Sequence, residues 1–355
     1  MAMNDLHSLV DERVALESRL QNEKGELSEP RAGDYEQEYA ALQRKLAALF
    51  KQAPGEGERI TVMLEMMRIL ENRLVYLHNF VVDATTDHRL LAQLVTRFID
   101  EIAGTNLLTK LEATYYRAVA ALYAGDVATA RAAFSEACAS EESDEANDIK
   151  YKSYVILGNL SHEERDYAKA KELHDQSLRY TQNNNVTAQA LALAALNAYA
   201  LADHDEALHL FQDALQLFDP AQPFFNSYFF RNALLFCAGI YFDRRDHAKA
   251  EEYYRRVVES VGESSYDYFD ALTHLGRIHY AQKRYDHAVA AFEKAIQTHR
   301  FNENEYLVDT WFRIARAHLK LDHGAEARPY LEKVAATDVK YAKKPQAVEL
   351  LRSVS

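Results

Sequence analysis

The sequence predicts an all-α protein, an α-solenoid of stacked helix pairs that follows an N-terminal helical hairpin. One residue pattern returns six times, marked by an Ala at positions 130, 170, 207, 250, 288 and 327. The chain has only 11 Gly and 6 Pro in 355 residues, well below ordinary usage, which leaves few residues for β-turns. A repeat of roughly forty residues indicates stacked supersecondary units and not a single wound core.

Two apolar stripes near the N-terminus predict the hairpin. Over residues 4–23 and again over 34–52, apolar residues are spaced by three and four positions, as in a coiled-coil seam. Between the stripes lies a polar stretch with Gly25, Pro30 and Gly33, where we expect the chain to turn. The hairpin could dock on the rest of the chain or form a homodimer through its seam, and the sequence leaves both open.

Two further helices are expected between the hairpin and the repeats. An apolar stripe over 60–81 predicts the first, and the second is expected over about 86–103, ending at Gly104. This helix pair could be a degenerate seventh repeat. The predicted domains are 1–56 for the hairpin, 57–104 for the helix pair, 105–337 for the six repeats and 338–355 for a C-terminal capping segment.

Each repeat has the residues of a closely packed helix pair. A small residue stands twelve positions before each repeat Ala, and a larger residue, mostly aromatic, stands four positions after it on the same helical face. Four positions before the Ala, an Asp can cap the second helix in the first four repeats. The small residues are Ala118, Gly158, Ala195, Ala238, Gly276 and Ala315. The larger ones are Phe134, His174, Phe211, Tyr254, Phe292 and Leu331. The expected caps are Asp126, Asp166, Asp203 and Asp246, with Arg284 and His323 at that place in the last two repeats.

This skeleton resembles the tetratricopeptide repeat over about residues 108–337. The best match is Leu275, Gly276, Tyr280, Ala288, Phe292 and Ala295. The resemblance implies a right-handed α-solenoid whose first helices line a concave groove, where ligands of this family usually lie. The repeats here exceed the usual 34 residues, and the Pro expected at each repeat end is missing except near Pro220. Longer helices or loops must take up the difference.

Charge and cysteine content narrow the range of partners. The net charge of −13 argues against nucleic acid or an anionic membrane as the main partner. Cys138 and Cys237 lie on apolar helix faces and are expected to be buried, reduced thiols. The chain opens with no charged-then-apolar leader and has no run of 18 apolar residues, so a cytoplasmic location is expected.

No arrangement of residues predicts catalysis, a metal site or a cofactor. The sequence has neither a Gly-rich phosphate loop nor a Gly-x-Ser-x-Gly elbow. His162, Glu163 and Glu164 begin like a zinc helix, but Asp166 stands where the second His would be needed. The Asp-His pairs at the repeat turns lie about forty residues apart, so capping by Asp next to a solvated His explains them. We therefore expect a protein that is not an enzyme.

The expected groove is apolar and aromatic toward its N-terminal end and rich in Arg toward its C-terminal end. Inward positions are two and three before each small residue, and one and four after it. The candidate partner-binding residues are Asn159, His162, Tyr199, Asn232, Phe242, His274, Arg277, Tyr280, Phe312, Arg313 and Arg316. Because Arg can bind a carboxylate through two parallel hydrogen bonds, the gradient favours a protein or extended peptide with an acidic group or a C-terminal carboxylate. Alternatively, these Arg residues pair with Asp270, Asp309 or Glu305 and bind nothing.

Two functions follow from the resemblance. The first is an adaptor or regulator that binds a protein segment in its groove; the chaperone-tail version is not expected, since Val155 and Leu193 replace two of its Lys-Asn-Asn-Lys-Arg positions. The second is a peptide-responsive bacterial regulator, because the layout resembles the Rap, NprR and PlcR quorum-sensing group. Residues 1–57 are too regular in their heptads for a DNA-reading helix-turn-helix. Such a regulator would act by sequestering a partner protein, as Rap-type members do.

Overall fold

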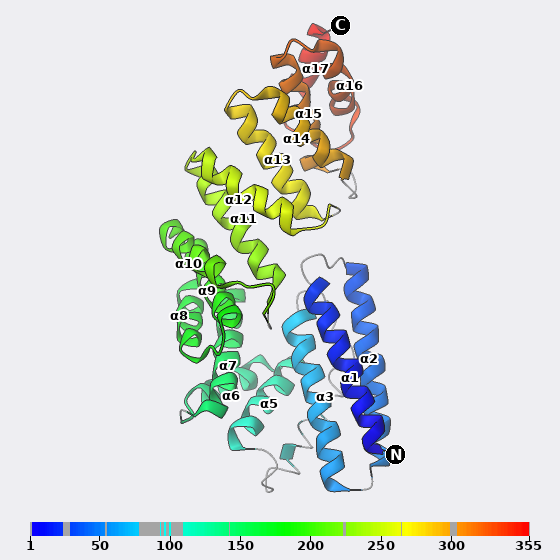
Figure 1. Cartoon of the computed structure of the whole chain (residues 1–355), viewed down its shortest axis with the longest axis vertical. Helices are drawn as coiled ribbons and strands as arrows, with labels where there is room; N and C mark the ends of the chain where they lie inside the picture. Colours follow the sequence, from blue (N-terminus) through cyan, green and yellow to red (C-terminus); the bar gives the residue numbers. More distant parts are fainter. Residues whose placement is uncertain are drawn as a thin grey trace. The chain divides into compact units, whose positions relative to one another are not determined.

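The computed structural model (Figure 1) describes residues 2–23, 29–53, 55–77, 93, 96, 99–100, 109–141, 143–222, 225–263, 265–298 and 304–354. Across these residues the chain forms helices and no strand, so the predicted all-α fold class is confirmed. The chain divides into two compact units, Met1–Phe230 and Arg231–Ser355. The domain boundaries expected at residues 56, 104 and 337 stay predictions.

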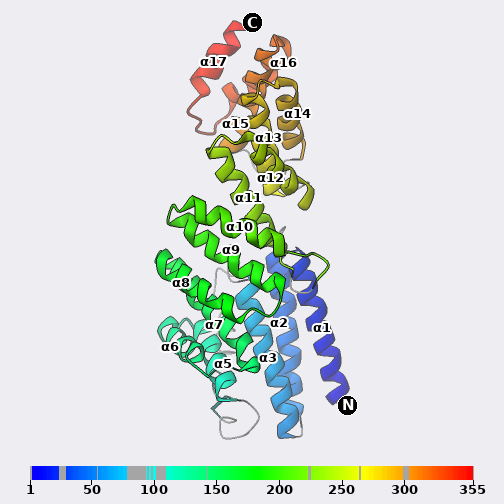
Figure 2. The ribbon, with the colours of Figure 1, turned by 60° about the vertical axis from the view of Figure 1, so that its left-hand side comes forward.

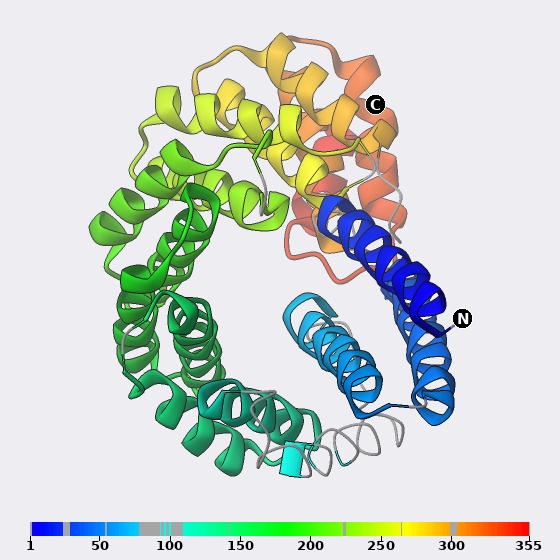
Figure 3. The same cartoon turned by 60° about the horizontal axis from the view of Figure 1, so that its bottom comes forward.

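Three long helices open the first unit: α1 (Ala2–Glu23), α2 (Glu29–Gln52) and α3 (Glu56–Leu77). The three pack on one another (Figure 3). The seam residues Leu6, Leu16 and Leu42 are buried, and Arg13, which interrupts the seam, forms an ion pair with Glu65 of α3 at 2.7 Å. The seam that could have served a homodimer is therefore buried within one chain.

The hairpin turn differs from the expectation. Because α2 already begins at Glu29, Pro30 and Gly33 lie in its first turns and not in the connection. Pro is tolerated there, since the N–H groups of a first helical turn have no partner within the helix. Of the helix expected over 86–103, all but residues 93, 96, 99 and 100 lie outside the described residues. One hydrophobic core runs from α1 through α3 into the first repeats.

Six helix pairs are described in the repeat region (Figures 1 and 2). In the first unit they are α5 (Lys110–Tyr123) with α6 (Val127–Cys138), α7 (Asp144–Glu163) with α8 (Tyr167–Ser177), and α9 (Asn184–Ala200) with α10 (His204–Leu217). The remaining pairs are α11 (Ser227–Asp243) with α12 (His247–Ser260), α13 (Tyr266–Ala281) with α14 (Tyr285–Thr298), and α15 (Glu305–Lys320) with α16 (Gly324–Ala336). The 3-10 turn η1 (Leu178–Tyr180) follows α8, and α17 (Lys344–Ser353) follows the last pair. The division between the two units falls within α11.

The residue skeleton read from the sequence is the packing contact inside each pair. All six repeat Ala residues have 0% exposure. A Cβ atom added to Gly276 would lie 2.5 Å from Cε1 of Phe292, and one added to Gly158 would overlap the imidazole ring of His174. The larger residue of the second helix is therefore seated directly on the backbone of the first, and only a small residue leaves room for it.

The turns confirm the predicted caps and add a feature that the sequence pattern did not reveal. The carboxylates of Asp126, Asp166, Asp203 and Asp246 each accept a hydrogen bond from the backbone N–H three residues later. His323 makes no such bond. The residue before each cap position has a left-handed φ of 61° to 82°. These residues are Gly125, Arg165, Ala202, Arg245, Lys283 and Asp322.

Backbone hydrogen bonds close each of these turns in the same way. In the third repeat, the N–H of Ala202 donates to the carbonyl of Tyr199 and the N–H of Asp203 donates to that of Ala198, both at 2.9 Å. This is the Schellman arrangement, which satisfies carbonyls left open at a helix end. A side chain in the left-handed region costs free energy, so Gly is the favoured residue there. Five of the six turns nevertheless hold another residue.

Ala202→Gly should stabilise the protein by about 0.5–1 kcal/mol, because Gly adopts the left-handed conformation without the clash of Cβ. Ala198→Gly is the matched control, since Ala198 is buried within α9 and Gly in a helix interior costs about 1 kcal/mol. Urea denaturation measures both. Destabilisation by Ala202→Gly would contradict the left-handed turn.

Gly276→Ala should lower the free energy of unfolding by about 1–3 kcal/mol, because the new methyl group must displace the ring of Phe292. Gly239 in α11 is the control: a Cβ there meets nothing within 4 Å, so Gly239→Ala should raise stability by about 0.5–1 kcal/mol through helix propensity. Equal effects of the two substitutions would show that the ring is not seated on Gly276.

Candidate functional site

The eleven candidate residues fall on the first helices of successive repeats, in both units. In the first unit, Asn159 and His162 on α7 are exposed and Tyr199 on α9 is half-buried. The other eight lie in the second unit, on α11, α13 and α15. Seven of them come together there, whereas Asn232 lies about 15 Å of helix away from Phe242 and joins none of the contacts below.

Four of the candidates are rings that close the repeat turns. Each stands four positions after its repeat's small residue and packs on the first residue of the second helix. The ring pairs, with their centroid distances, are His162 and Tyr167 (5.1 Å), Tyr199 and His204 (4.9 Å), Phe242 and His247 (5.9 Å), and Tyr280 and Tyr285 (5.2 Å). The turn thus fixes the place of each ring at the end of its first helix.

In the second unit, two of these rings also carry a guanidinium group from the next repeat. The guanidinium of Arg277 lies 4.5 Å from the centroid of Phe242, and that of Arg316 lies 5.3 Å from the centroid of Tyr280. Each Arg directly follows the small residue of its repeat, so the two contacts are equivalent under the repeat. Both are cation–π contacts. We call Phe242, Arg277, Tyr280 and Arg316 the arginine ladder.

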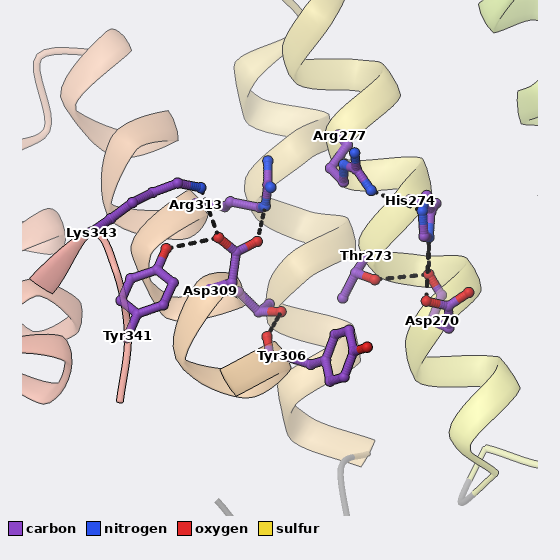
Figure 4. A network of polar contacts seen from close by, with 10 residues as sticks. Asp270, Thr273, His274, Arg277, Tyr306, Asp309, Arg313, Tyr341 and Lys343 are labelled. Atoms are coloured by element: carbon purple, nitrogen blue, oxygen red, sulfur yellow. Dashed lines mark hydrogen bonds and ion pairs between the residues drawn. The ribbon is translucent and has the colours of Figure 1, made fainter. Parts of the chain in front are cut away.

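Arg277 is held in place from a second side by His274. The guanidinium donates to Nε2 of His274 at 2.8 Å, and Nδ1 of the same ring lies 3.0 Å from the carbonyl oxygen of Asp270 (Figure 4). Because guanidinium only donates and a carbonyl only accepts, His274 carries its proton on Nδ1. Its ring stacks on Tyr254 at 4.8 Å. These contacts fix both the position and the orientation of Arg277.

The two ladder cations have no carboxylate partner within the described part of the chain. Arg277 and Arg316 are both half-buried. Burial, and next the nearby Arg313, lower the pKa of Arg277. Since guanidinium stays charged in proteins, this shift reflects a partly desolvated charge, which the nearby Tyr254, Asp309 and Asp270 offset only in part. A bound anion would relieve that cost.

Unlike Arg277 and Arg316, Arg313 pairs with an acidic residue of its own helix, which was the alternative considered from the sequence. It forms an ion pair with Asp309, which also accepts hydrogen bonds from the hydroxyl of Tyr341 at 2.7 Å and from Nζ of Lys343 at 3.1 Å (Figure 4). Although burial raises it, these three donors lower the pKa of Asp309. Burial and the bond to Asp309 raise the pKa of Tyr341. Asp309 therefore ties the C-terminal segment to α15.

The expectation that Phe312 lines the groove is wrong. Phe312 has 0% exposure, because the segment 337–343 crosses α15. The ring of Tyr341 packs against that of Phe312, with the two ring centroids 6.0 Å apart. The capping role expected for 338–355 did not include Tyr341 and Lys343, which share Asp309 with Arg313. No repeat pattern could have revealed them, because they come from outside the repeats.

In the first unit, the exposed His162 is the outer end of a polar network between two repeats, whose other side chains, Asn197 and His174, are buried. Its Nδ1 lies 2.7 Å from Oδ1 of Asn197, whose Nδ2 lies 2.8 Å from Nδ1 of His174 and donates to the carbonyl of Leu193 at 2.8 Å. Since that carbonyl can only accept, Oδ1 of Asn197 accepts from His162 and Nδ1 of His174 carries no proton. Burial lowers the pKa of His174 to about 4.

Among the described residues, no group of three or more His, Cys, Asp or Glu could hold a metal ion. Cys138 and Cys237 are free thiols, and burial raises the pKa of each to about 12, so neither is a nucleophile at neutral pH. No described helix is long and apolar enough to span a membrane.

Comparison with known proteins finds tetratricopeptide repeats in the middle of the chain. Two tetratricopeptide-repeat family models match residues 192–262 and 230–300. No curated protein matches the chain. Among solved structures, the apo form of RapI is 12% identical with a TM-score of 0.55, over 99% of this chain and 97% of that chain. The C-terminal part of a TPR repeat-containing protein from Cytophaga hutchinsonii is 11% identical with a TM-score of 0.55, over 80% and 99% of the two chains. A signal-transduction ATPase with a tetratricopeptide-repeat sensor from Pyrococcus horikoshii is 14% identical with a TM-score of 0.53, over 90% and 49%. At these identities the likeness shows the fold.

Lowering the pH from 7 to 5 should lower the free energy of unfolding by about 2 kcal/mol through His174 alone. The unfolded side chain takes up a proton near pH 6.5 and the native one only near pH 4. Between these values unfolding binds a proton, so the free energy of unfolding falls as the pH falls. Urea titrations at the two pH values measure the loss.

The double variant His174→Phe/Asn197→Ala is the control, because it copies the contact between the fifth and sixth repeats, which have Phe292 and Ala317 at these places. It should lose about 2 kcal/mol less between pH 7 and 5 than the natural protein. Burial also lowers the pKa of His279 and His318, but both remain in the variant and cancel in the comparison. An unchanged pH dependence would mean that His174 is not buried neutral.

Proposed function

Because this chain carries tetratricopeptide repeats, we propose that it is a non-enzymatic protein-interaction module, an adaptor or regulator that binds an extended segment of a partner protein. The binding surface is the face of α11, α13 and α15 that holds the arginine ladder. The observation that carries the proposal is that Arg277 and Arg316, fixed on aromatic rings, have no carboxylate partner within the described part of the chain.

The arrangement suits an acidic group on the partner. A guanidinium that lies on a ring keeps its N–H groups at its edge, where a carboxylate can accept two of them at once. Since the rings and His274 already hold the side chain of Arg277, binding loses little further side-chain entropy. This favours an aspartate, a glutamate or a C-terminal carboxylate of the partner.

An apolar contact is available on the same helices. Tyr306 near the start of α15 is 64% exposed and Tyr266 at the start of α13 is 39% exposed, with their ring centroids 6.2 Å apart. Aromatic side chains of this kind are common anchors in interfaces. Tyr306, Asp309 and Arg313 follow one another at helical spacing on one face of α15, so a partner segment can reach the tyrosines and the ladder together.

A second candidate is a peptide-responsive regulator that sequesters a partner protein. The likeness to RapI supports it, because it extends over nearly the whole of both chains and so takes in the N-terminal helices as well as the repeats. In this version the ladder holds a short free peptide. Two free thiols, Cys237 buried and Cys138 half-buried, fit a cytoplasmic setting for either function.

Native mass spectrometry of the protein purified from its own host tests the proposal. The protein should carry a bound partner, and Arg277→Glu with Arg316→Glu should weaken that binding about tenfold or more, equivalent to about 1.4 kcal/mol. Arg313 is left unchanged because it holds Asp309. A bound peptide of a few residues favours the regulator, and a stoichiometric protein favours the adaptor.

Arg256→Glu is the matched control for this experiment. Arg256 also lies over a ring, 5.5 Å from the centroid of Tyr253, but on α12, the second helix of its repeat. It should leave partner binding unchanged. Retention of the partner by the ladder variant, or equal loss in the control, would contradict the groove assignment.

A further inference from the structure

Resting on the proposed function, we infer that the partner segment presents two acidic side chains three residues apart in an extended chain, one for Arg277 and one for Arg316. The preceding proposal requires only one acidic group. The repetition of the Arg–ring contact from one repeat to the next is the new observation.

The number of anions follows from how the cations of this unit are used. Arg313 and Lys343 share the carboxylate of Asp309, so they are already neutralised in part. Among the described residues, neither Arg277 nor Arg316 forms a hydrogen bond or ion pair with a carboxylate. Both lie on rings and Arg277 also donates to His274, while Asp309 and Asp270 act on Arg277 only at longer range. Two cations are therefore open to two anions.

The arginine ladder has two Arg–ring contacts, which we call its rungs, and not more. The position directly after the small residue is Val119, Asn159, Leu196 and Gly239 in the first four repeats, and Arg only in the last two. None of the first four side chains carries a charge. The array therefore has two consecutive cation sites of the same geometry, and a ligand with two matching anions uses both.

The spacing of the two anions follows from helix packing. The side chain of Arg316 on α15 reaches the ring of Tyr280 on α13, and Tyr306 on α15 reaches Tyr266 on α13. We therefore take the separation of these two helices to be roughly the 8–10 Å typical of neighbouring helices. A polyproline-II chain has three residues per turn and rises about 3.1 Å per residue. Side chains three residues apart thus point the same way about 9 Å from each other, which matches the separation expected for the two Arg–ring contacts.

The charge of the second unit is consistent with an acidic occupant. Residues 231–355 hold 20 Lys and Arg against 18 Asp and Glu, although the whole chain has a net charge of −13. All of the net negative charge therefore belongs to residues 1–230. An acidic segment is repelled least by the part of the chain that carries the ladder.

Two fluorescein-labelled peptides of the same composition test the inference by fluorescence anisotropy at low salt. One is Ser-Glu-Pro-Pro-Glu-Ser, in which proline favours the polyproline-II conformation, and the other is Ser-Pro-Glu-Glu-Pro-Ser. The first should bind about fivefold or more tightly than the second. Arg277→Gln and Arg316→Gln should each abolish that preference, since either leaves a single rung.

Arg256→Gln is the control and should keep the preference. Circular dichroism of each variant should match the natural protein, because neither ladder Arg pairs with a carboxylate in the part of the fold that the structure describes. Equal binding of the two peptides, no saturable binding of either, or the same loss in the control would overturn the inference. If the charge-reversal variant nevertheless releases the natural partner, the two-anion inference fails alone. If it does not, the proposed function fails with it.

Discussion

The contact between a small residue on the first helix of each pair and a larger side chain on the second is the constraint on which the rest depends. With His174 seated on Gly158 and Phe292 on Gly276, the first helix cannot rotate about its axis without a clash. Its rotation decides which side chains face away from the second helix. The residue directly after the small one is therefore always presented at the same angle, about 100° around the first helix from the contact with the second, which is where Arg277 and Arg316 are found.

The turn transmits this register to the site. A left-handed residue followed by a cap position gives every turn the same path. In the four repeats whose first helix ends with an aromatic ring, that ring therefore meets the first residue of the second helix. Because Phe242 and Tyr280 are held in this way, they offer flat, fixed surfaces to the guanidinium groups of the following repeats. Packing, turn geometry and the cation sites thus form one chain of causes.

The sequence was sufficient to predict the structural features that recur in each repeat, and insufficient to predict those that occur only once. Six recurrences of the skeleton identified the helix pairs, the buried Ala residues and four Asp caps. The left-handed turns escaped, because only Gly125 shows the residue that this conformation favours. Asp309 four residues before Arg313 was a readable helical ion pair, which Arg277 and Arg316 lack, with Thr273 and Phe312 at that distance. The burial of Phe312 under Tyr341 was not readable, since it depends on a contact between distant, unrepeated segments.

The central claim is that the cations of the arginine ladder contact the partner directly. The most direct measurement is a two-dimensional NMR spectrum of the arginine Nε–Hε groups, recorded with and without the co-purified partner. The account predicts that the signals of Arg277 and Arg316 shift when the partner binds, while that of Arg256, on the ring of Tyr253, keeps its position. Unshifted signals of Arg277 and Arg316 in a saturated complex would contradict it.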